Sequence, residues 1–231
     1  MIQLVVFDLA GTTVHDGDAV NRSFRETLAT WKIEANPTAV NAVMGLPKPE
    51  AIRILLDQFG RSRGIEPTAK NIDAIHDDFT RRMIAYYATA PDVREIPGAG
   101  EAFLKLRQAG VKVALNTGFF RPIVDALLAR LGWRVPETID AVVTSDSVPH
   151  GRPHPDMIHR AMQLLGVVDP RFVAKVGDTQ VDLEEGTNAG CGLVVGVTTG
   201  ASTREQLSAY PHTHIVESVA EVPQLILGNS G

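Results

Sequence analysis

The chain has 231 residues, of which 44% are hydrophobic and 21% are charged. This length allows one or two domains at roughly 150 residues each, and the composition supplies enough apolar side chains for a folded core, which excludes a disordered chain. The 22 basic and 27 acidic residues leave a net charge of −5. The chain therefore lacks the basic excess that is typical of proteins binding nucleic acid or anionic membranes.

The sequence also argues against export and membrane insertion. Its single cysteine, Cys191, can form neither an internal disulfide nor a cysteine-based zinc site. No apolar run reaches the roughly 18 residues of a membrane-spanning helix. The apolar start at residues 2–7 stops at Asp8 and lacks the basic flank of a signal peptide. We therefore expect a soluble cytoplasmic protein.

Short apolar runs alternate with helical patterns along much of the chain. Residues 2–7 predict a buried parallel strand, because they form a short apolar run that ends in a carboxylate and a glycine-containing turn. Helical patterns, such as those at 101–109 and 122–131, precede or follow further apolar runs. These further runs lie at residues 111–116, 141–145, 172–177 and 193–197. The alternation predicts an α/β fold with a parallel sheet.

Residues 15–96 interrupt this alternation and contain no convincing strand. Residues 19–31 and 49–59 predict helices, and a third is expected to begin after Thr68, a good N-cap. Its apolar residues recur at helical spacing, at Ile72, Ile75, Phe79 and Met83. We therefore predict an α/β core of residues 1–14 and 97–231, interrupted by an all-helical domain of residues 15–96. An insertion after the first strand lies at the carboxyl edge of the sheet, where ligands bind, so we expect it to cover an active site.

Four polar segments follow expected strands, at residues 8–13, 116–118, 151–155 and 177–182. A carboxylate at a strand end, such as Asp8, can present a nucleophile over a turn of free backbone N–H groups. Thr117 and Gly118 suit a phosphate oxygen at a helix start, and Asp178 with Asp182 suits Mg²⁺, which prefers hard oxygen ligands. Each segment alone is ordinary loop chemistry. Their order at successive strand ends is a more specific signal than any one of the segments.

In this order the segments resemble the four motifs of the haloacid dehalogenase superfamily of phosphotransferases. The resemblance covers the predicted core, and the helical insertion is similar in position and character to the superfamily's cap domain. It implies a Rossmann-like core in which Asp8 attacks phosphorus in line and forms an aspartyl-phosphate that water hydrolyses.

The resemblance also implies a metal site and a phosphate site. Mg²⁺ would be held by the carboxylates of Asp8 and Asp178 and by the carbonyl of Ala10, with Asp182 as a further acidic group acting through water. The phosphoryl oxygens would be bound, and their charge neutralised, by residues of the first three motifs: Gly11, Thr12, Thr117, Gly118 and Arg152.

Two substitutions narrow the resemblance to one branch. Most phosphatases of the superfamily have a second aspartate that protonates the leaving alkoxide, where this chain has Ala10. Most also have a lysine where this chain has Arg152. Both substitutions, together with the cap segment at residues 44–48 (MGLPK), resemble the phosphonoacetaldehyde hydrolase branch, which has Asp-x-Ala-Gly-Thr-Thr, Gly-Arg-Pro and Met-Gly-Leu-x-Lys.

This branch implies cleavage of a carbon–phosphorus bond in a 2-oxoalkylphosphonate. By resemblance, Lys48 forms a Schiff base with the substrate carbonyl, and the carbon leaves as an enamine that needs no proton from position 10. Arg152 stays charged and cannot condense with the carbonyl. We expect nearby cations to lower the pKa of Lys48, and Met44 to contact the substrate and keep Lys48 dry. The branch also implies a homodimer through the cap.

Three positions differ from that branch. Ala51 stands where the branch has a cap histidine, and Phe119 where it has an aromatic hydroxyl. The segment at residues 15–18 lacks the branch's cysteine. These differences predict a sister of phosphonoacetaldehyde hydrolase that acts on a substituted 2-oxoalkylphosphonate, with His15 either as a replacement proton shuttle or as polar surface.

Other interpretations stay open on the sequence alone. Lys48 lies between two prolines and is also compatible with a solvated surface charge. The chain is further compatible with a small-molecule phosphomonoesterase, or with a non-catalytic module that binds phosphate. Three histidines near Arg152 lack the spacing of a metal cluster, so we interpret them as structural or as neighbours of Arg152: His150, His154 and His159.

Overall fold

The computed structural model describes residues 1–15 and 17–228, so Asp16 and residues 229–231 lie outside the description. Its centre is a sheet in the strand order β3-β2-β1-β4-β5-β6, in which every neighbouring pair is parallel. The predicted parallel α/β fold is confirmed, and a short sixth strand is added. The strands are β1 (Leu4–Phe7), β2 (Lys112–Thr117), β3 (Ala141–Thr144), β4 (Val173–Gly177), β5 (Leu193–Val197) and β6 (His214–Val216).

Helices cover both faces of the sheet, which explains the nearly continuous apolar runs of its strands. In β1, Val5 and Phe7 belong to one apolar cluster and Leu4 and Val6 to another. The first cluster includes residues of α5 (Ala99–Gln108), α6 (Arg121–Leu131) and α10 (Val222–Leu227). The opposite face packs against α7 (Asp156–Leu165), α8 (Gln180–Asn188) and α9 (Arg204–Ser208).

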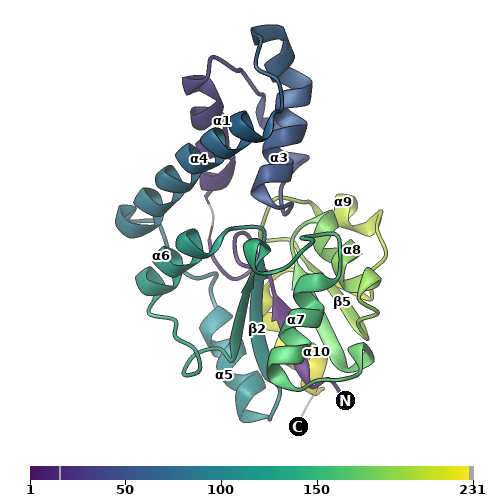
Figure 1. Ribbon diagram of the computed structural model, residues 1–231. Helices are drawn as coiled ribbons and strands as arrows, with labels where there is room; N and C mark the ends of the chain where they lie inside the picture. The colour runs from purple at the N-terminus through teal and green to yellow at the C-terminus, as the bar shows by residue number, and fades with distance from the viewer. Residues whose placement is uncertain (16, 229–231) are drawn as a thin grey trace.

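A helical layer lies beyond one end of the sheet (Figure 1). Its α-helices are α1 (Ala19–Thr30), α2 (Pro37–Asn41), α3 (Lys48–Leu55) and α4 (Ala69–Thr89). A π-helical turn and a 3₁₀ turn, at Leu56–Gly60 and Arg61–Arg63, follow α3. Thr68 caps α4 as predicted, because its hydroxyl accepts a hydrogen bond of 3.3 Å from the Asn71 N–H. No helix among residues 1–15 and 17–228 has the length and apolar character needed to cross a membrane.

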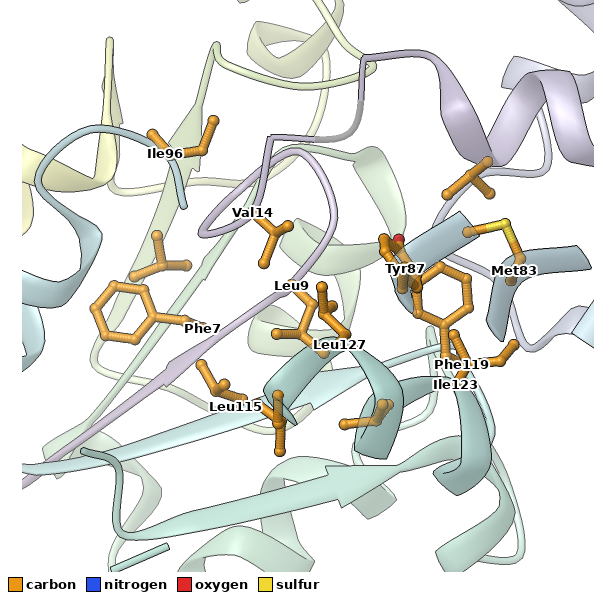
Figure 2. Close-up of a cluster of buried hydrophobic side chains, with 14 of the residues drawn as sticks. Phe7, Leu9, Val14, Met83, Tyr87, Ile96, Leu115, Phe119, Ile123 and Leu127 are labelled. Atoms are coloured by element: carbon orange, nitrogen blue, oxygen red, sulfur yellow. The ribbon is translucent and has the colours of Figure 1, made fainter. Parts of the chain in front are cut away.

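Apolar side chains join the helical layer to the sheet domain. Met83 and Tyr87 of α4 lie beside Phe119 and Ile123, at the start of α6 (Figure 2). The rings of Tyr87 and Phe119 meet edge to face, with centroids 6.1 Å apart. All four residues belong to the same buried cluster as Phe7 of β1. This seam fixes the helical layer over the strand ends.

We expect the Phe103→Ala substitution to lower the free energy of unfolding by about 3–5 kcal/mol. The buried Phe103 ring packs between Phe7 and Trp133, with centroid distances of 5.4 and 5.1 Å. Urea denaturation measures the loss. The neighbouring residue is a matched control, because Leu104 is 55% exposed and Leu104→Ala should change stability by less than about 0.5 kcal/mol. Equal losses for the two variants would contradict this packing.

Candidate active site

The four polar segments converge at the carboxyl ends of the central strands. Strand order reverses between β1 and β4, which makes this edge the topological switch point where α/β proteins bind ligands. Asp8 follows β1, Asp178 follows β4, and Thr117 is the last residue of β2. Arg152 reaches the same place from the loop before α7. The residues that the sequence places at successive strand ends therefore meet at one edge of the sheet.

A cavity of about 360 Å³ lies between these strand ends and the helical layer. Most of the residues predicted for the site line it: Asp8, Ala10, Gly11, Met44, Lys48, Thr117, Gly118, Arg152 and Asp178. The strand-end residues form the floor of the cavity, and residues of the helical layer form its roof. Thr12 and Asp182 do not line the cavity, because they are fully buried behind the floor residues Asp178 and Arg152 that they contact.

Arg152 is the centre of a buried ionic cluster under the cavity. Its guanidinium lies 2.7 Å from Asp8 Oδ1, 2.9 Å from Asp182 Oδ1 and 3.2 Å from Glu185 Oε2. It also donates two hydrogen bonds of 2.8 Å to the backbone and side-chain oxygens of Asn116. The planar fork of an arginine suits such multiple contacts, which a lysine could not reproduce. One side chain thus ties β1, β2 and α8 together.

Lys175 is the second cation of this cluster, and it was not predicted from the sequence. It lies in β4 with no exposed surface, and its Nζ is 2.9 Å from Asp182 Oδ1 and 3.2 Å from Glu185 Oε2. It also donates a hydrogen bond of 2.6 Å to Asn116 Oδ1. The sequence did contain a signal for this residue. Lys175 lies within an otherwise apolar strand, where a charge needs buried partners.

Three carboxylates form a candidate metal site. Asp8, Asp178 and Asp182 each offer an oxygen, and these oxygens lie within 4.8 Å of one another. Asp178 is oriented by Thr12, whose hydroxyl donates to Oδ1 at 3.0 Å, and by the Ala201 N–H, which donates to Oδ2 at 2.7 Å. An all-oxygen donor set of this kind suits Mg²⁺.

The pKa shifts in this site reflect burial first and the neighbouring charges second. Burial raises the pKa of Asp8, against the opposing effect of Arg152. Burial and the neighbouring carboxylates Asp8 and Asp182 raise the pKa of Asp178 well above its usual value. Burial acts in the same sense on Asp182, but Arg152 and Lys175 outweigh it, so the pKa of Asp182 lies below its usual value. Burial opposes the charge of Arg152, yet its carboxylate partners raise its pKa.

The turn after Asp8 differs from the prediction of free backbone donors. The Gly11 N–H donates to the Val14 carbonyl at 2.9 Å, and the Thr12 N–H donates to the Leu9 carbonyl at 3.2 Å. These two N–H groups are therefore engaged within the turn and do not belong to the predicted free donors. Since Thr12 lies beneath the floor and contacts Asp178, its position fits carboxylate orientation better than the expected phosphate contact.

Lys48 enters the cavity from the helical layer. It is the first residue of α3 and is only 3% exposed, which overturns the interpretation of a solvated surface lysine. Its Nζ lies 4.9 Å from the ring centroid of Phe119 and 5.5 Å from that of Phe24. Aromatic faces attract a cation at such distances. Met44 lines the same cavity, as predicted.

Glycines allow the segment before Lys48 to approach the core. A Cβ at Gly118 would collide with the Leu46 carbonyl oxygen, and a Cβ at Gly151 would collide with the Pro47 ring. Gly45 has a positive φ of 80°, a conformation that favours glycine. These close contacts hold the loop before α3 directly against the second and third motifs.

Several cavity-lining residues were not predicted as site residues. Asp18 and Asn21 come from the start of the helical layer, and Asn41 ends α2. His15, which the sequence offers as a proton shuttle or as polar surface, also lines the cavity. Ala51, where the related branch has a histidine, is fully buried and does not line the cavity.

The three histidines near Arg152 form no metal site. His150, His154 and His159 are exposed. Within residues 1–15 and 17–228, the group Asp8, Asp178 and Asp182 is the metal-ligand cluster that the structure contains.

Comparison with known sequences supports this arrangement. The sequence model of the haloacid dehalogenase-like hydrolases matches residues 2–190. A phosphonoacetaldehyde hydrolase from Bacteroides fragilis is 32% identical over 98% of this chain and 89% of that protein. One from Bacillus cereus is 31% identical over 99% of this chain and 89% of that protein.

Solved structures show the same fold. A phosphonoacetaldehyde hydrolase-like protein from Oleispira antarctica superposes with a TM-score of 0.83 at 26% identity, over 98% of this chain and 91% of that one. CbbY from Rhodobacter sphaeroides in complex with phosphate gives a TM-score of 0.78 at 22% identity, over 96% of each chain. At 22% identity, the similarity to CbbY shows a shared fold alone.

We expect the Lys175→Met substitution to lower the free energy of unfolding by about 3–5 kcal/mol, because it leaves the carboxylates of Asp182 and Glu185 buried with one cation fewer. Thermal and urea denaturation test this. Lys105 pairs with Glu101 at 2.7 Å on the exposed face of α5, so Lys105→Met should cost less than about 1 kcal/mol. A Lys175→Met protein as stable as the Lys105→Met control would refute the ionic cluster.

Proposed function

Since the chain belongs to the haloacid dehalogenase-like hydrolases, in the branch similar to phosphonoacetaldehyde hydrolase, we propose that it cleaves the carbon–phosphorus bond of a 2-oxoalkylphosphonate with the help of Mg²⁺. One observation carries the proposal. A carboxylate, Asp8, and a buried amine, Lys48, line the same cavity, while position 10 is an alanine that cannot act as an acid.

The donor set fits a divalent cation. The cluster joins four carboxylates, those of Asp8, Asp178, Asp182 and Glu185, to two cations, Arg152 and Lys175, as far as the described residues extend. The surplus of two negative charges matches the charge of Mg²⁺. Burial first, and neighbouring carboxylates second, raise the pKa values of Asp8 and Asp178. We propose that Asp8, Asp178 and the Ala10 carbonyl hold the ion, with Asp182 behind them. When bound, Mg²⁺ neutralises charge on the phosphoryl oxygens.

The first step is imine formation at the roof of the cavity. The amine of Lys48 attacks the substrate carbonyl carbon, and water leaves, which joins the substrate to the protein through a C=N bond. This step needs the neutral amine. The Phe119 and Phe24 faces favour the protonated imine that forms.

The second step transfers the phosphoryl group to the floor. An oxygen of Asp8 attacks phosphorus, and the electrons of the breaking C–P bond move to carbon and neutralise the iminium nitrogen. The leaving group is therefore an enamine, which needs no proton donor at position 10. Arg152 orients Asp8 across 2.7 Å, and Arg152 and Thr117 face the phosphoryl oxygens, where they stabilise the transition state.

Water then completes the cycle at both ends. It attacks the aspartyl-phosphate on Asp8 and releases inorganic phosphate. The enamine takes a proton at carbon, and a second water hydrolyses the resulting imine, which frees Lys48 and the dephosphonated carbonyl compound. We treat residues 15–96 as the cap domain that encloses these intermediates, and residues 1–14 with 97–231 as the core.

A phosphomonoesterase is the second candidate, and one observation favours it. His15 lines the cavity, so an imidazole is available to protonate a leaving alkoxide in place of the missing acid at position 10. Phosphate release from phosphonoacetaldehyde and from a phosphate monoester of similar size separates the two functions. Release from the ester alone, unaffected by Lys48 substitution, would establish the phosphatase.

We expect Lys48→Arg to reduce phosphate release from the phosphonate by at least about 10³-fold, because an arginine cannot form the imine. The expected companion result is a mass increase on Lys48 when the wild-type protein and phosphonate are treated with borohydride. Lys70→Arg, on α4 outside the cavity, serves as the control and should keep wild-type turnover. Full activity of Lys48→Arg would refute the Schiff base.

Removal of divalent ions by EDTA should abolish turnover, and added Mg²⁺ should restore it. Asp178→Asn should raise the Mg²⁺ concentration needed for half-maximal activity by at least about tenfold, because it removes one of the hard anionic ligands. Isothermal titration with Mg²⁺ gives the affinity independently of turnover. Asp146→Asn, at an exposed acid after β3, should leave the affinity unchanged. Undiminished turnover in EDTA would exclude the metal.

A further inference from the structure

The cavity has more room than phosphonoacetaldehyde needs. Cavities of roughly 300–1,000 Å³ hold drug-sized ligands, whereas this aldehyde has only two carbons beside its phosphoryl group. The cavity measures about 360 Å³ and adjoins a second hollow of about 570 Å³. Both are lined by Asn41, Met44, Thr179 and Ala201. The two spaces are therefore neighbours that share these four residues, two from the helical layer and two from the sheet domain.

The second hollow has a polar but uncharged lining. Among the described residues, none of those that line it carries a charge. Tyr210 donates a hydrogen bond of 2.6 Å to Gln180 Oε1, which fixes the orientation of that amide. The other polar side chains of the hollow are Thr38, Asn41, Thr179, Ser202 and Gln206. Hydroxyl and amide groups of this kind recognise groups that both donate and accept hydrogen bonds.

Asn41 is held in place where the two spaces meet. The Asn21 side chain, only 2% exposed, donates through Nδ2 to Asn41 Oδ1 at 2.6 Å and to the Pro37 carbonyl at 3.0 Å. Arg25 donates to Asn21 Oδ1 at 2.8 Å, which sets the orientation of that amide. Because Asn41 Oδ1 accepts from Asn21, the Nδ2 group of Asn41 is the side that remains to donate to a ligand.

We propose that the substrate is a 2-oxoalkylphosphonate whose chain continues beyond the carbonyl carbon as an uncharged, hydroxylated tail. The phosphoryl group lies on the floor beside Asp8, the carbonyl carbon lies at Lys48, and the tail passes Asn41 into the second hollow. This inference rests on the proposed function. It adds the class of substituent that distinguishes the substrate from phosphonoacetaldehyde.

The hydroxylated tail follows from the cost of the alternatives. A charged tail would meet no counter-charge in the lining of the second hollow. An alkyl tail would displace water from amide and hydroxyl groups without replacing their hydrogen bonds. A hydroxyl group can pair with both the hydrogen-bond donors and the hydrogen-bond acceptors of the lining.

The test compares three substrates by phosphate release: phosphonoacetaldehyde, 4-hydroxy-2-oxobutylphosphonate and its methyl isostere, 2-oxopentylphosphonate. We expect kcat/KM for the hydroxylated compound to exceed that for the isostere by about tenfold or more, since a site built to bind a hydroxyl discriminates against the analogue that lacks it. It should also exceed the value for phosphonoacetaldehyde. Equal values for the hydroxylated compound and its isostere would overturn the inference.

Two variants test whether residues of the second hollow cause the preference for the hydroxylated substrate. Asn41→Asp keeps an oxygen for Asn21 but removes the amide donor and adds a charge, and Thr38→Val removes a hydroxyl at nearly constant shape. Each should reduce the preference for the hydroxylated compound by at least about threefold, as expected for one lost hydrogen bond. Thr89→Val makes the same exchange at the last residue of α4 and should keep the wild-type preference. An unchanged preference in both Asn41→Asp and Thr38→Val would also overturn the inference.

The failure of the proposed function gives a different result. If that function is wrong, none of the three phosphonates releases phosphate, and borohydride traps no adduct on Lys48. If only the tail inference is wrong, phosphonoacetaldehyde is turned over and trapped on Lys48, but the hydroxyl group gives no advantage.

Discussion

The site depends on one constraint, which is that Arg152 and Lys175 are buried and must be neutralised there. An unpaired charge in a protein interior costs several kcal/mol, so the chain surrounds these two cations with Asp8, Asp182 and Glu185. The contacts join three strands and α8. They also bring more carboxylates together than two cations can balance once Asp178 is included. The same constraint that holds the strand ends in register therefore creates an anionic site suited to a divalent cation.

The position of the helical layer follows from a different interaction. The apolar seam between α4 and α6 fixes the layer from one side (Figure 2), and the loop before α3 fixes it from the other, against Gly118 and Gly151. Lys48 begins α3 directly after that loop. The contacts of this loop therefore place Lys48 over the strand-end residues of the cavity.

Much of this site could be predicted from the sequence because strand ends are easy to recognise. Short apolar runs locate the strands, parallel strands bring their carboxyl ends together, and Asp8, Thr117 and Asp178 follow directly. The resemblance implied that Thr12 binds the phosphate, whereas its hydroxyl donates to Asp178, a residue that is distant in the sequence. The pairing of Asn21 with Asn41 depends on how α1 and α2 pack, which no spacing along the chain reveals.

Side chains from both the core and the helical layer surround the amine of Lys48. Phe119 lies in the second motif of the core, and Phe24 lies on α1 of the helical layer, yet both rings face the same amine. Where a related branch has an aromatic hydroxyl, this chain has a plain phenyl ring, which offers a face for a cation and no proton to exchange. In the proposed reaction this ring would favour a cationic imine and would not compete for its proton. In the proposed reaction the proton transfers would then need another group of the cavity, and His15, which lines it, is the imidazole we propose for them.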